Sequence, residues 1–149
     1  MEYSIRSCEI ADLAKLVILC QKHAAFEKAD YDPKGKEESL KKALFDEQPK
    51  LFCMVVEVNK TIAGYVSYTF DYSTWDAGTF LYMDCLFLEE NARNFGIGEV
   101  LINKLKEIGK AKNCINLQWQ TPEFNKRAIQ FYNKIGAKGS NKARFSLDL

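Results

Sequence analysis

The spacing of apolar side chains along the chain changes several times, and each change marks a predicted element. Residues 9–23 repeat apolar positions every three or four residues, the spacing of an amphipathic helix, whereas 3–8 alternates in the manner of a strand. Clusters of turn residues such as "DPKGK" at 32–36 separate these runs. The predicted strands are 3–8, 51–58, 62–72, 79–88, 114–120 and 144–149, and the predicted helices are 9–23, 37–47, 97–112 and 125–137.

The predicted order of elements is β-α-α-β-β-β-α-β-α-β. The three central strands are joined by short connections, "NKT" and "STWDAG", so they form an antiparallel meander. The strand-helix-strand unit over 79–120 has the length of a right-handed parallel crossover. We therefore expect an α/β fold of the mixed α+β kind. Its sheet is antiparallel in the first half with a parallel step near the middle, in a single domain over 1–149.

Composition excludes several classes of partner. The chain has 149 residues with 21 basic and 20 acidic side chains, and a net charge of +1 gives no reason to expect nucleic acid or a membrane surface. No apolar stretch reaches the length that spans a bilayer. The start, "MEYSIRSCEI", lacks the basic-then-apolar layout of a secretory signal. We therefore expect a cytoplasmic protein.

Cysteine and histidine usage limits the chemistry further. The five cysteines are scattered and form no C-x-x-C pair, which is typical of reduced thiols. The single histidine, His23, lies where a helix is expected to end, so no metal site and no Ser-His-Asp hydrolase are expected. For His23 itself the sequence predicts a helix-terminal residue without chemistry.

The stretch "ARNFGIGEVL" at 92–101 combines an arginine and two glycines directly before a predicted helix. A helix start leaves backbone N–H groups unpaired and carries partial positive charge, so it suits phosphate. Gly96 and Gly98 would let a pyrophosphate approach the backbone, and Arg93 adds positive charge. The stretch is not a P-loop, and Leu101 replaces the third glycine of G-x-G-x-x-G. The alternative is a plain turn with two glycines, but its place between strand and helix favours phosphate.

Two motifs in this order, "RNFGIG" and "NKRAIQFYNKIGA", resemble the GNAT superfamily of N-acetyltransferases over nearly the whole chain. Within it, "AFE" after the first helix, "STWDAG" and "LYMD" are most similar to the diamine and thialysine acetyltransferase branch. The resemblance implies the GNAT fold with a splayed central sheet and acetyl-CoA as co-substrate. It also implies a homodimer.

The resemblance also implies roles for individual residues. The pyrophosphate would rest on the N–H groups of Phe95, Gly96, Ile97 and Gly98, with Arg93 and Asn94 beside it. The backbone of Cys85, Leu86 and Phe87 would pair with the pantetheine arm, and the Leu86 N–H would donate to the oxyanion. Asn125 and Tyr132 match the family's Asn and Tyr, and Tyr132 would protonate the leaving thiolate.

The acceptor amine would meet acidic and aromatic residues, which bind an ammonium group by charge and cation–π contact. The candidates for the substrate site are Glu27, Trp75, Asp76 and Asp84. Asp84 stands where the branch usually carries Glu, so it would act on the amine directly or through a water. Cys85 follows where the branch usually carries Asp. Each candidate has a structural alternative: a solvated carboxylate for the acids and a turn anchor for Trp75.

We therefore expect an N-acetyltransferase that moves the acetyl group of acetyl-CoA directly to a small cationic amine, such as a diamine, polyamine or lysine-like amino acid. A route through an acetylated Cys85 is the minor alternative for the mechanism. Other acceptors, namely a protein N-terminus, a lysine side chain or an aminoglycoside, stay open. An acyl-CoA-binding sensor without turnover is the alternative from another class.

Overall fold

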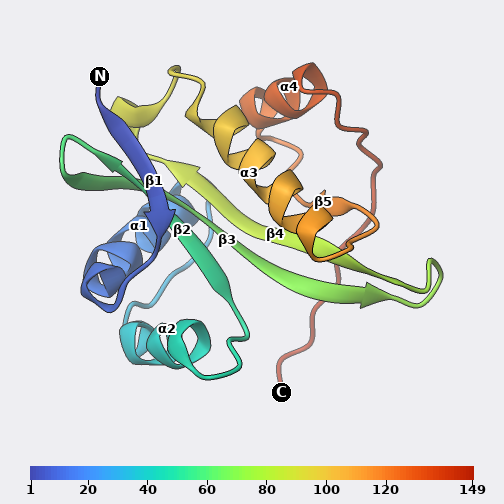
Figure 1. Ribbon diagram of the computed structural model, residues 1–149, viewed down its shortest axis with the longest axis horizontal. Helices are drawn as coiled ribbons and strands as arrows, with labels where there is room; N and C mark the ends of the chain where they lie inside the picture. The colour runs from blue at the N-terminus through green and yellow to red at the C-terminus, as the bar shows by residue number, and fades with distance from the viewer.

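Five strands form one mixed sheet in the computed structural model, which describes residues 1–149 (Figure 1). The strands are β1 (Tyr3–Ser7), β2 (Phe52–Val58), β3 (Thr61–Ser73), β4 (Gly78–Leu88) and β5 (Leu117–Trp119), adjacent in that order. The helices are α1 (Leu13–Phe26), α2 (Lys36–Phe45), α3 (Ile97–Ala111) and α4 (Lys126–Lys134), with short 3-10 turns at Ile10–Asp12 and Glu90–Ala92. No helix is both long and apolar enough to cross a membrane.

The strand directions confirm the predicted mixed sheet. The first four strands pair antiparallel and β5 pairs parallel to β4, after the crossover through α3. The β2–β3 connection is a two-residue turn at Asn59 and Lys60, whose φ angles are 48° and 67°. Positive φ at both positions gives the turn that matches the twist of a hairpin.

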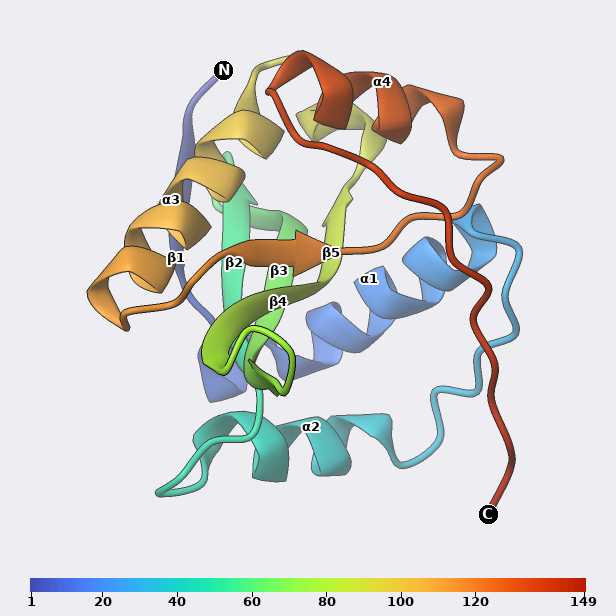
Figure 2. The same ribbon diagram turned by 90° about the vertical axis from the view of Figure 1, so that its right-hand side faces the viewer.

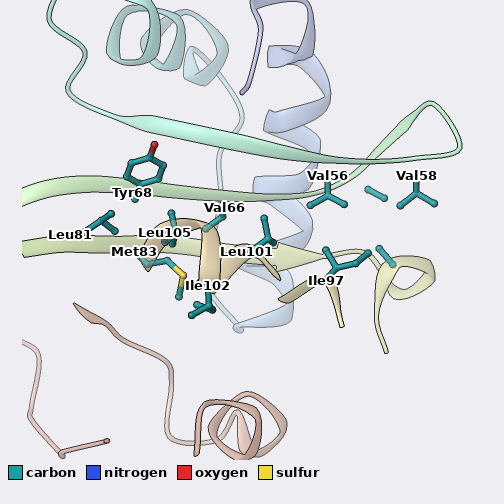
Figure 3. Close-up of a cluster of buried hydrophobic side chains, with 12 residues drawn as sticks. Val56, Val58, Val66, Tyr68, Leu81, Met83, Ile97, Leu101, Ile102 and Leu105 are labelled. Carbon is teal, nitrogen blue, oxygen red and sulfur yellow. The ribbon is translucent and has the colours of Figure 1, made fainter. Parts of the chain in front are cut away.

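Helices cover both faces of the sheet (Figure 2). Helices α1 and α2 pack on one face, with Leu13, Leu19 and Leu44 among the buried side chains. Helix α3 packs on the other face, where Ile97 and Leu101 meet strand residues of β2, β3 and β4 (Figure 3). Because both faces are buried, the central strands are almost continuously apolar rather than alternating.

The predicted last strand, 144–149, is wrong. Residues 137–149 belong to no helix or strand, and the side chains of Phe145 and Leu147 are 91% and 90% exposed. Alternation of apolar residues favours a strand only where a neighbouring strand supplies hydrogen-bond partners. The outer edge of β5 is free, but β5 itself is only Leu117–Trp119, shorter than the predicted 114–120.

Asp12→Ala is expected to lower the free energy of unfolding by about 2 kcal/mol, because a buried carboxylate with charged hydrogen bonds is lost. Asp12 accepts from Arg6 Nη1 at 2.7 Å, Arg6 Nη2 at 3.0 Å and the Glu9 backbone N–H at 2.8 Å. The Arg6 hydrogen bond lowers the pKa of Asp12 from its ordinary value. The stabilisation is therefore present above the pKa of an unfolded aspartate and is lost as pH falls through the folded-state pKa.

Urea unfolding from pH 7 down to about pH 3 measures both effects, since an unfolded aspartate titrates near pH 4. The difference in the free energy of unfolding between the wild type and Asp12→Ala should become smaller toward about pH 3. Asp148→Ala, at an exposed position, is the control and should change little. A difference that stays constant over this range would contradict the ion pair with Arg6.

Candidate active site

The central feature of the site is the point where β4 and β5 separate. The two strands pair only through Leu81–Met83 and Leu117–Trp119, and Figure 2 shows them diverging beyond that point. On the other side of β4, Met83 lies opposite Tyr68 and Cys85 opposite Ser67, so Asp84 is the extra residue of a β-bulge. A bulge bends the strand and redirects its side chains. A cavity of about 490 Å³ lies here, lined by α1, β4, the loop after it, α3 and α4.

The N-terminus of α3 forms one wall of this cavity. Its N-cap is Gly96, which has a φ of 76°, and no side chain caps the helix. A side chain at Gly96 would meet nothing within 4 Å, so the left-handed φ rather than a lack of space favours glycine here. At Gly98 a Cβ would lie 3.3 Å from the ring of Phe131, so this glycine allows α4 to pack closely on α3. Gly96 thus shapes the anion seat, by which we mean the backbone N–H groups at the start of α3. Gly98 allows this part of α3 to contact α4.

Two arginines surround this helix start. Arg93 donates through Nε to the Leu88 carbonyl at 2.8 Å, and its guanidinium lies 5.1 Å from the ring centre of Phe26. Arg127, in the first turn of α4, donates through Nη2 to Asn94 Oδ1 at 2.6 Å. Both line the cavity, so positive side-chain charge and the positive end of α3 act at the same place. The arrangement suits a doubly charged anion.

Tyr132 reaches the cavity from α4. Its ring packs edge-on against Trp119, with centres 5.1 Å apart, which fixes it near the end of β5. Burial, together with the negative charge of Glu27, raises the pKa of Tyr132 to about 12. The phenol therefore holds its proton at neutral pH and can act only as a donor of that proton. Asn125 also lines the cavity, and its side chain accepts from the Ala128 N–H at 3.2 Å as the N-cap of α4.

Glu27 and Asp84 supply negative charge to the same cavity from α1 and β4. Beside them lies Cys85, whose thiol pKa is raised to about 12 by burial and by the charge of Asp84. Little thiolate is present at neutral pH, and the thiolate is the nucleophilic form. The cavity thus holds acids and a proton donor but no activated thiol.

A family model described as the acetyltransferase (GNAT) family matches residues 17–137. The chain belongs to the GNAT acetyltransferase family. It is therefore an acetyltransferase, and GNAT acetyltransferases use acetyl-CoA as co-substrate.

Relatives of this GNAT chain include the thialysine N-epsilon-acetyltransferase of Bos taurus, which is 31% identical over 147 residues, or 93% of this chain and 86% of the relative. The enzyme of the same name from Caenorhabditis elegans is 27% identical, over 81% and 74%. Among solved structures, a possible acetyltransferase from Clostridium difficile 630 matches with a TM-score of 0.82 at 21% identity, over 100% of this chain and 99% of that one. An aminoglycoside acetyltransferase from a soil metagenomic sample matches with a TM-score of 0.81 at 20% identity, over 99% and 96%. These two structures show the fold alone.

The GNAT fold brings most of the predicted site residues together. The predicted residues that line the cavity are Glu27, Asp84, Cys85, Leu86, Phe87, Arg93, Asn94, Gly96, Ile97, Gly98, Asn125 and Tyr132. Phe95 points outward and is exposed. Trp75 and Asp76 lie at the tip of the β3–β4 hairpin, where Trp75 is 96% exposed and Asp76 hydrogen-bonds Ser73. Trp75 and Asp76 therefore lie away from the cavity, whereas the predicted role of Phe95 concerns its backbone N–H and stays a prediction.

Sequence reasoning missed other residues of this GNAT cavity, notably His23, Gln120 and Arg127. Arg127 carried a usable signal, since it stands two residues after Asn125 in the first turn of the same helix. His23 stands one helical turn before Glu27, so both side chains lie on one face of α1. His23 does lie in the last turn of α1, as predicted, yet its side chain belongs to the cavity wall.

Proposed function

We propose that this chain transfers the acetyl group of acetyl-CoA directly to a primary amine of a small cationic substrate, a lysine-like amino acid or a diamine. The observation that carries the proposal is that one cavity combines the uncapped start of α3, the protonated phenol of Tyr132 and the carboxylates of Glu27 and Asp84. The relatives named thialysine N-epsilon-acetyltransferase support the choice of an amino group on a lysine-like side chain.

The residues present fit acetyl-CoA. A pyrophosphate needs backbone donors and positive charge, and Gly96–Gly98 with Arg93 and Arg127 offer both. The edge of β4 beyond Met83 has no partner in β5, so its peptide groups are free to pair with the amides of the pantetheine arm. Bound acetyl-CoA supplies a thioester carbon for the amine to attack, and a thiol as leaving group.

Different residues of the cavity donate and accept protons during the transfer. Tyr132 holds a proton at its hydroxyl, which it donates to the departing sulfur. Asp84 accepts the amine's proton, directly or through a water, and its position in the cavity wall supports this role. The Leu86 N–H is the donor for the developing oxyanion. Direct transfer fits better than a route through Cys85, since that thiol stays protonated.

A panel of amines with acetyl-CoA and a thiol-release assay tests the proposal. We expect turnover with thialysine, lysine and short diamines, because each carries ammonium groups that the carboxylates attract. An arylamine that is uncharged near neutral pH is the control and should turn over poorly. Turnover confined to uncharged amines, peptide N-termini or aminoglycosides would overturn the substrate class. Binding of acetyl-CoA without thiol release on any amine would identify a sensor instead.

A further inference from the structure

The chain's one histidine makes specific contacts in the cavity wall. His23 Nε2 lies 2.5 Å from Glu27 Oε2, one helical turn away, and Nδ1 lies 3.1 Å from the hydroxyl of Tyr65. The imidazole stacks on the ring of Phe87, with centres 5.2 Å apart and planes 22° apart. The side chains of His23 and Glu27 remain 15% and 33% exposed, so a substrate in the cavity can reach them.

Hydrogen-bond chemistry assigns the proton between His23 and Glu27. A carboxylate only accepts, so Nε2 must carry the hydrogen that points to Glu27. In the neutral ring Nδ1 then accepts from the Tyr65 hydroxyl, and in the protonated ring Nδ1–H donates to the same oxygen. The hydroxyl can reverse its role by rotation. His23 can therefore gain or lose a proton without moving away from Glu27.

The phenols and thiols around this pair stay uncharged near neutral pH. Burial raises the pKa of Tyr65, which also contacts the thiols of Cys20 and Cys85, and the pKa values of both thiols are raised as well. Tyr132, on α4 across the cavity, is likewise held neutral.

The remaining charges near the pair are those of carboxylates and an arginine. Phe87, on which the His23 imidazole stacks, also has the Arg93 guanidinium 5.7 Å from its ring centre. Asp84 lines the cavity from β4. Among side chains, histidine is the one that ordinarily changes charge between about pH 5 and 8. Protonation of the His23 imidazole would therefore change the charge of this wall by one unit.

We propose that His23 positions Glu27 and sets the negative charge with which the cavity binds a second ammonium group of the substrate, the one that is not acetylated. With neutral His23, the pair carries one negative charge and the free oxygen of Glu27 binds the ammonium. With protonated His23, the pair is neutral and the cation is held less tightly. This inference rests on the proposed function, because it concerns the acceptor of that reaction.

The test compares a diamine with the monoamine of equal carbon length. Deprotonation of the reacting amine affects both substrates alike, so the ratio of the two KM values isolates the second ammonium. In the wild type this preference for the diamine should fall about 5-fold between pH 8 and pH 5.5, the effect of one partly exposed ion pair. Neither kcat value should follow this ratio, since the second ammonium binds equally in the ground and transition states.

Two variants separate the roles. His23→Gln keeps a donor for Glu27 but does not titrate, so the diamine preference should stay high and become independent of pH. Glu27→Gln removes the negative charge, so the preference at pH 8 should be about 5-fold lower than in the wild type. Glu38→Gln, on the exposed surface of α2, makes the same change in net charge and should behave as the wild type.

The outcomes distinguish this inference from the proposed function. Wild-type pH dependence that persists in His23→Gln, or an unchanged diamine preference in Glu27→Gln, overturns the inference while acetylation itself stands. Failure of the wild type to acetylate either amine overturns the proposed function and the inference with it. If circular dichroism shows that His23→Gln does not fold, Glu27→Gln decides alone, through the size of its ratio at pH 8: a value about 5-fold below the wild type supports the inference and an unchanged value overturns it.

Discussion

Tyr132→Phe is expected to lower kcat by at least about 100-fold, the usual contribution of a positioned general acid. The substitution removes only the hydroxyl. The ring keeps its edge-on contact with Trp119 and its contact with Phe131, so α4 should pack as before. An interaction made only in the transition state lowers kcat and kcat/KM together. The KM for acetyl-CoA should therefore change little.

The pH profile gives this prediction a second readout. Because burial raises the pKa of Tyr132 to about 12, its deprotonation should cause no loss of wild-type kcat below about pH 11. Tyr68→Phe is the matched control, since Tyr68 is a buried tyrosine that packs with Phe52 and Phe70 and does not line the cavity. Thiol release by both variants from pH 7 to 10 measures the effect. A Tyr132→Phe enzyme that keeps half of the wild-type kcat would remove Tyr132 as the acid.

Local patterns predicted the fold well wherever an element pairs with its chain neighbour. The hairpin at Asn59 and Lys60 and the crossover through α3 bring adjacent segments together, so spacing and turn residues were sufficient. The predicted strand at 144–149 failed because strand formation depends on a partner that sequence alternation does not supply. The homodimer stays a prediction of the resemblance, and the cytoplasmic location stays a prediction of the composition and the N-terminal pattern.

The site was predictable where a motif is contiguous and less so where the fold assembles it. Gly96, Gly98 and Tyr132 belong to short motifs and lie in the cavity. Trp75 entered the prediction through the resemblance of "STWDAG" and the cation–π chemistry of its ring, yet the long β3–β4 hairpin carries it to the molecule's edge. His23 was predicted to be a helix-terminal residue without chemistry. Its partner Tyr65 lies on a strand that no local pattern connects with α1.

Leu101→Ala is the substitution that we expect to cost most in stability, about 3–4 kcal/mol of the free energy of unfolding. Leu101 is fully buried in the cluster that joins α3 to the sheet, among Val66, Leu81 and Leu105 (Figure 3). Removing its branched end leaves a cavity between a helix and a sheet that are each held by other contacts, so little collapse can fill it. The melting temperature should fall by roughly 10 °C for a chain of this length.

Ile18→Ala removes the same number of carbon atoms from the outer face of α1, where Ile18 is 48% exposed, and should change stability by less than about 0.5 kcal/mol. Urea unfolding of both variants measures the difference, and activity per folded molecule gives the second readout. Leu101 lies one turn from Gly98, so a shift of α3 would change the anion seat and raise the KM for acetyl-CoA. If that KM stays at the wild-type value while stability falls, the start of α3 is held by Ile97 and by the contact of Gly98 with Phe131. A loss below about 1 kcal/mol would contradict the packing of α3 on the sheet.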